Sequence, residues 1–153
     1  MTRLRPRVAV SVPVEERLYS RVVDLAAYGQ DDQPLLVLMF CSGAVSTYCR
    51  ECLAAARLFP NGPSPFVCVT DSKNALLIET GTGEVIHEGM GAIPIYGELV
   101  RMAEERWVAP LNPDQAEREA RILYAYSESL LGCCGHATCA AEEKGGRFSE
   151  KAG

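Results

Sequence analysis

The chain has 153 residues, 48% of them hydrophobic and 23% charged, with a net charge of −5. This composition is ordinary for one soluble globular domain. The acidic balance and the lack of a basic stripe argue against nucleic acid or an anionic membrane as the main partner. The longest apolar stretch, residues 35–41, is too short to span a bilayer. The composition therefore predicts a soluble protein, without a membrane span, whose partners are other proteins.

The first part of the chain predicts a strand followed by a helix. Residues 8–12 form an apolar run that ends at Pro13, which favours a strand over a secretory signal. After Pro13, four apolar residues fall at offsets 0, 4, 7 and 8, the spacing of one helical face, and Gly29 provides a stop: Leu18, Val22, Leu25 and Ala26. We therefore expect an amphipathic helix between Pro13 and Gly29.

The middle of the chain predicts a covered sheet. Residues 35–40 are apolar on both faces, which is typical of a central strand, and residues 66–70 form a second buried strand. Residues 75–79 and 84–88 flank a glycine-containing turn and indicate a β-hairpin. A further helix is predicted from one apolar face: Ile95, Leu99, Met102 and Ala103. The expected order is β-α-β-α-β-β-β-α.

A Cys-x-x-Cys pair, Cys49 and Cys52, lies between the strand at 35–40 and a helix predicted to open from Cys52. At a helix N-terminus the pKa of Cys49 should fall, with Arg50 lowering it further and Glu51 opposing. Cys52, one turn away, could then resolve a mixed disulfide. The alternatives are an idle pair or a disulfide that only locks the turn.

The strand, the Cys-x-x-Cys turn and the closing hairpin and helix, in this order, resemble the thioredoxin-like family over residues 8–107. The resemblance implies an α/β fold with a central mixed sheet of four to five strands flanked by helices, and thiol–disulfide exchange by Cys49 and Cys52. The chain departs from the family at the intervening Arg50-Glu51. It also lacks the cis-proline that family enzymes place just before the third core strand, facing the disulfide; in this chain that position falls near Asn74 or Ala75. Such degenerate copies occur in large DNA viruses.

Residues 110–132 predict an additional helix, whose apolar face packs on the domain or on a partner. Asn112 is the expected N-cap, Pro113 the first helical position and Gln115 the partner in a capping box, and Gly132 should end the helix. Four potential metal ligands follow in seven residues: Cys133, Cys134, His136 and Cys139. Their compact spacing would strain a tetrahedral site, so we predict no metal, and free thiols or interchain disulfides instead.

The chain has seven cysteines, an odd number, so they cannot all pair within one chain. We expect a reducing, intracellular compartment. Cys41 and Cys68 should then be small buried apolar residues. We expect a thioredoxin-like domain (1–109), the extra helix (110–132) and a Cys-rich, partly flexible tail (133–153). The predicted function is a thiol–disulfide oxidoreductase that needs no cofactor beyond a reducing partner. The alternative is a non-catalytic structural or assembly protein, such as a minor capsid component in a virion, which would bind partners through the extra helix and tail.

Overall fold

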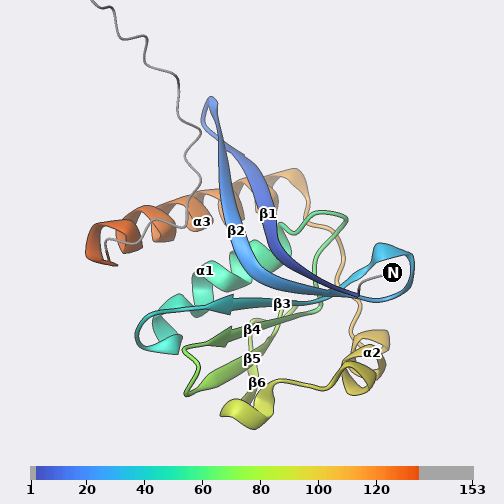
Figure 1. The fold of residues 1–153 in the computed structure, drawn as a ribbon. Helices are drawn as coiled ribbons and strands as arrows, with labels where there is room; N and C mark the ends of the chain where they lie inside the picture. Colours follow the sequence, from blue (N-terminus) through green and yellow to red (C-terminus); the bar gives the residue numbers. More distant parts are fainter. Residues whose placement is uncertain (1–2, 135–153) are drawn as a thin grey trace, which may run out of the picture.

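The computed structural model describes residues 3–134, and side chains up to residue 126. These residues form a mixed six-stranded sheet with helices on both faces (Figure 1). The strands are β1 (Leu4–Val14), β2 (Arg17–Tyr28), β3 (Pro34–Phe40), β4 (Phe66–Thr70), β5 (Ala75–Glu79) and β6 (Val85–Glu88). The helices are α1 (Val45–Arg57), α2 (Tyr96–Glu104) and α3 (Pro113–Cys134), with short 3-10 turns at Gln30–Asp32 and Met90–Ala92.

The strands lie in the sheet in the same order as in the chain. Strands β3 and β4 are parallel and are joined by α1, whereas all other neighbouring strands are antiparallel. Strand β1 is an edge strand, and it contains Pro6 and Pro13. Proline cannot donate a backbone hydrogen bond, so an edge is where a strand tolerates it.

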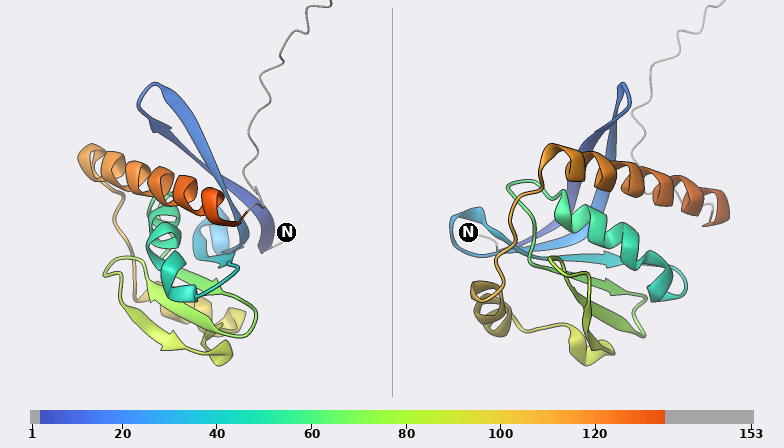
Figure 2. Two further views of the ribbon diagram at one scale, coloured as in Figure 1. Left: turned by 90° about the vertical axis from the view of Figure 1, so that its left-hand side faces the viewer. Right: turned by 180° about the vertical axis from the view of Figure 1, so that it is seen from behind.

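Alternating side chains of the central strands fill two separate apolar layers. Val37 and Met39 of β3 join the layer under α1 and α3, whereas Leu36 and Leu38 join the layer under α2. Figure 2 shows α1 and α3 together on one side of the sheet and α2 apart from them. The prediction of a covered central strand is therefore confirmed for residues 35–39, whereas Phe40 at the end of the strand is 57% exposed.

The helix predicted between Pro13 and Gly29 is wrong, because this segment is strand β2. A tight hairpin turn at Glu15, which has a φ of 55°, returns the chain antiparallel to β1 from Arg17 onward. The other edge of β2 pairs with β3. The apolar spacing that suggested a helix is overridden because β2 satisfies backbone groups of two neighbouring strands at once.

The observed fold class is mixed α/β, with six strands in place of the expected four to five. From β3 to α2 the element order agrees with the prediction, including the β5–β6 hairpin and the following helix. Within that helix region Leu99 is buried as expected, but Ile95 precedes α2 and is 69% exposed.

Helix α3 starts with the predicted capping box. The Asn112 side chain accepts a hydrogen bond from the Gln115 backbone N–H at 2.8 Å, and the Gln115 side chain accepts one from the Asn112 N–H at 3.2 Å. The helix continues past the expected stop at Gly132 to Cys134. It packs on α1 and β1, with Ala120 and Leu123 buried in their apolar layer. Within the described part of the chain, no helix has the length and apolarity to cross a membrane.

Candidate functional site

Both cysteines of the Cys-x-x-Cys pair lie within α1, and neither marks its start. The helix begins at Val45, after the connector at residues 41–44, in which Gly43 has a φ of 133°. The Tyr48 hydroxyl donates to the Ser42 carbonyl at 3.2 Å and holds this connector against the helix. The expectation that the helix opens at Cys52 is therefore wrong. Residues such as Val45 and Thr47 are weak helix formers, so local propensity gave no signal for the earlier start.

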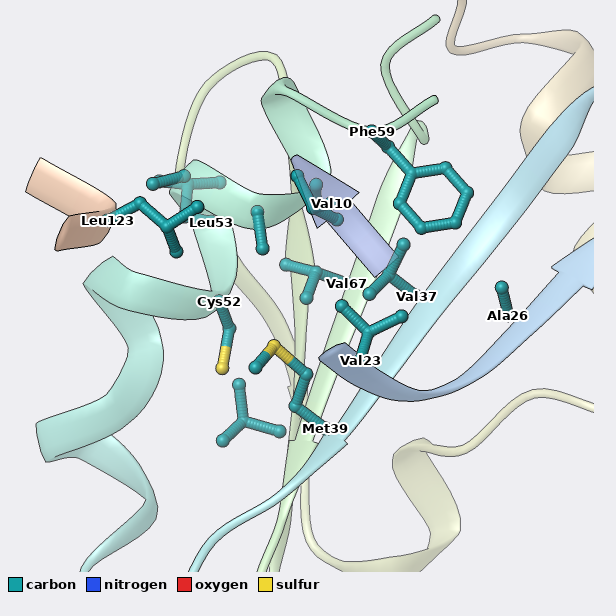
Figure 3. Packing of buried hydrophobic residues seen from close by; sticks show 14 of the residues in the cluster. Val10, Val23, Ala26, Val37, Met39, Cys52, Leu53, Phe59, Val67 and Leu123 are labelled. Carbon is teal, nitrogen blue, oxygen red and sulfur yellow. The ribbon is translucent and has the colours of Figure 1, made fainter. Parts of the chain in front are cut away.

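Cys49 and Cys52 differ sharply in exposure. Cys49 is half-buried, and its thiol donates to the Val45 carbonyl at 3.3 Å, one turn earlier. Cys52 is 1% exposed, and Figure 3 shows it inside the apolar layer together with Met39 and Val23. A half-buried thiol therefore lies one helical turn from a fully buried one, along the same side of α1.

A third thiol, that of Cys41, belongs to the same region. Cys41 follows directly after β3, is partly exposed and packs against the apolar layer that contains Cys52. The sequence predicted only a buried apolar role for Cys41. Its position directly after the strand that leads to the Cys-x-x-Cys pair was the feature that could have placed it near this pair. Cys68, in contrast, is fully buried in the layer on the other face of the sheet. Among the described residues all four cysteines are free thiols.

The environment raises the thiol pKa values, contrary to the expected lowering at Cys49. Burial raises the pKa of Cys49, against a smaller opposing effect of its own backbone N–H. Burial, with the neighbouring Glu51 carboxylate, raises the pKa of Cys52 well above its usual range. Burial and the Asp71 charge raise the pKa of Cys41 to about 11. Only the backbone N–H groups of the first helical turn are free to stabilise a thiolate, and Cys49 lies beyond that turn. Desolvation therefore dominates its pKa.

The two residues between the cysteines are each engaged elsewhere. Arg50 donates through Nη1 and Nη2 to Glu119 of α3, at 2.8 and 2.9 Å. Glu51 is 1% exposed and accepts from Arg21 of β2 at 2.6 Å. The prediction that Arg50 supports a Cys49 thiolate is therefore not met, because its guanidinium is directed to α3. Arg50 and Glu51 instead fix α1 between α3 and the β1–β2 hairpin, through their ion pairs with Glu119 and Arg21.

Of the remaining candidate residues, only His87 has a described side chain. His87 is exposed on β6. Cys133 and Cys134 end α3 but have no described side chains, and His136 and Cys139 lie outside the described residues. Within the described part of the chain, no group of three His, Cys, Asp or Glu side chains is placed to hold a metal.

Comparison of the chain with protein-family models, with curated proteins and with solved structures gave no match. The site consists of Cys49 and Cys52 on α1, which ion pairs anchor at both sides, and of Cys41 in the connector before this helix. The three thiols differ in exposure, and none has a stabilised thiolate.

Proposed function

We propose that the protein is a thiol–disulfide redox protein, related to the thioredoxin-like family, that reduces protein disulfides through Cys49 and Cys52. The observation that carries this proposal is the placement of a half-buried thiol one turn before a fully buried thiol on α1. The strand–helix–strand unit β3–α1–β4, with its parallel pairing, supports the family relationship. The setting is an intracellular one with a reducing partner.

The reaction transfers two electrons to the substrate. The Cys49 thiolate attacks one sulfur of a substrate disulfide, forms a mixed disulfide and releases the other sulfur as a thiolate, which takes up a proton. The Cys52 thiolate, after losing its own proton, attacks the Cys49 sulfur and releases the second substrate thiol. The protein is left with a Cys49–Cys52 disulfide, which a thiol or dithiol reductant must reduce before the next cycle.

The raised pKa values define what kind of redox protein this would be. A low thiol pKa stabilises the reduced form and makes a pair oxidising. Burial acts in the opposite direction at Cys49 and Cys52, so the pair should be a reductant. The same burial leaves little thiolate at neutral pH, so turnover should be slow there and faster in alkaline solution.

A second candidate is the non-catalytic structural or assembly protein, for which a minor capsid component is one form. The observation that favours it is that α1 offers Cys49 no free N–H groups and no neighbouring cation, because Arg50 is bound to Glu119. In that case Cys49 and Cys52 would act only as apolar residues of the core.

Reduction of a small aromatic disulfide by the pre-reduced protein separates the two candidates. The wild type should react in two steps and end as an intramolecular disulfide, Cys49→Ser should lose the reaction, and Cys52→Ser should accumulate the mixed disulfide at Cys49. Cys68→Ser is the matched control, since its thiol is buried on the opposite face of the sheet. Equal reaction of wild type and Cys49→Ser, with an intact fold, would refute the redox proposal.

A further inference from the structure

A cleft separate from the thiols lies between α1, the β5–β6 turn and the segment that leads into α3. Its volume is about 570 Å³, which is within the usual range for small-molecule sites. Arg50 and Arg57 line it from α1, on the side of the helix that faces α3, and Arg118 lines it from α3. Cys49 and Cys52 do not line it.

The charge in this cleft is unbalanced in favour of an anion. Glu119 is the only acidic side chain among the described residues that line it. This one carboxylate binds both Arg50 and Arg57, at 2.8 and 3.0 Å, and Arg118 forms no ion pair with any described residue. Three guanidinium groups against one carboxylate leave a net charge of +2, which matches a phosphate dianion.

One of the donors, Arg57, is held in place before any ligand arrives. Arg57 donates through Nε to the Thr80 carbonyl at 3.1 Å and through Nη1 to Glu119, and its Nη2 donates to no described residue. Thr80 also lines the cleft, is fully buried, and its hydroxyl has no hydrogen-bond partner among the described residues. The Thr80 carbonyl, and not its fully buried hydroxyl, is therefore the group that fixes Arg57 at the wall of the cleft.

The cleft also offers a flat aromatic surface. Trp107 lines it and is 73% exposed, which is unusual for the largest apolar side chain. Exposed tryptophan rings in ligand sites stack on aromatic rings. Val108 and Ile122 add apolar lining.

We propose that this cleft binds a small molecule that carries both an aromatic ring and a phosphate group, as a nucleoside monophosphate does. The phosphate would contact Arg57 and Arg118, and the ring would stack on Trp107. This proposal does not depend on the thiols, and Cys49→Ser should leave the binding unchanged.

The chain contains one tryptophan, Trp107, so its fluorescence reports on binding at this residue, which lines both this cleft and a smaller neighbouring pocket. Titration with AMP should quench the emission to saturation, and calorimetry gives the affinity independently. Ribose 5-phosphate, which lacks the ring, and adenosine, which lacks the phosphate, should each bind at least about tenfold more weakly.

Two variants test where the phosphate and the aromatic ring of the ligand bind. Arg118→Gln should weaken AMP binding about tenfold. Arg121→Gln is the matched control, because this exposed arginine lies on the same helix but outside the cleft and should leave the affinity unchanged. Trp107→Ala, measured by calorimetry, should weaken AMP about tenfold and leave ribose 5-phosphate unaffected. No saturable AMP binding, equal affinity for AMP and ribose 5-phosphate, or equal effects of the two arginine variants would overturn the proposal.

Discussion

Arg50 and Glu119 form a two-fold hydrogen-bonded ion pair, at 2.8 and 2.9 Å, that joins α1 to α3 across 69 positions of sequence. Glu119 also accepts a hydrogen bond from Arg57, further along α1, so a single carboxylate binds two guanidinium groups. This relationship explains two properties of the protein. It removes a positive charge from the neighbourhood of Cys49, and it makes α3 an integral part of the domain.

Replacement of Glu119 by Gln should destabilise the protein by about 2 kcal/mol, because it leaves two partly buried guanidiniums without their anion. Urea denaturation followed by circular dichroism measures the loss. Glu117→Gln is the control: its ion pair with Arg121 is exposed and lies within one helix, so its loss should cost less than about 0.5 kcal/mol. Equal effects of the two changes would contradict the role given to Glu119.

The contribution of Glu119 to the stability of the fold should decrease as the pH falls. Burial alone would raise its pKa, but hydrogen bonds and charges from Arg50 and Arg57 outweigh this and hold the pKa below its usual range. A lowered folded-state pKa means stability that is present above the ordinary glutamate pKa of about 4.3 and lost as the pH falls through the folded-state value. The stability difference between wild type and Glu119→Gln should therefore be full at neutral pH and vanish in acid. A difference that grows in acid would show the opposite linkage.

Alkylation of the thiols should follow exposure and continue to accelerate with pH. Cys49 should react with iodoacetamide before Cys52 and Cys68, since both of these are buried. Because burial raises the pKa of Cys49, its rate should still be rising above the ordinary thiol pKa of about 8.5. Mass spectrometry of digested samples, taken over a pH series, gives the rates. A plateau below that pH would mean an activated thiolate.

Mild oxidation should link Cys49 to Cys52. In a regular helix, Cβ atoms three residues apart are about 5–6 Å apart, whereas a disulfide holds them at about 4 Å. The second turn of α1 must therefore tighten, and oxidised protein should show a small loss of helical circular dichroism. Peptide mapping identifies the bond, and Cys41→Ser tests the competing neighbour. A bond found only between Cys41 and Cys49 would exclude Cys52 as the resolving thiol.

Truncation of Leu123 should show that α3 belongs to the core. The side chain is fully buried between α3, α1 and β1, so Leu123→Ala should cost about 2–5 kcal/mol. Tyr124→Ala, at the next position, removes a side chain that is 39% exposed and serves as the comparison, with a smaller loss. If Leu123→Ala were neutral, α3 would not be part of the core.

Elements whose signals are local could be predicted from the sequence. Strands β3 and β4 are apolar on both faces, and the capping box of Asn112 and Gln115 forms between residues three positions apart. In each case the residues that specify the element lie within it, and here the tertiary structure agrees with the local pattern.

The tertiary structure alone decided strand β2 and the character of Cys49. The apolar residues of β2 fit a helix by spacing, and only pairing with β1 and β3 makes the strand the better solution. The sequence places Cys49, Arg50 and Cys52 together, but the pKa of Cys49 depends on where α1 starts, how deeply it packs and which carboxylate captures Arg50. Desolvation and ion pairing are set by residues distant in the chain, so no local motif could specify them.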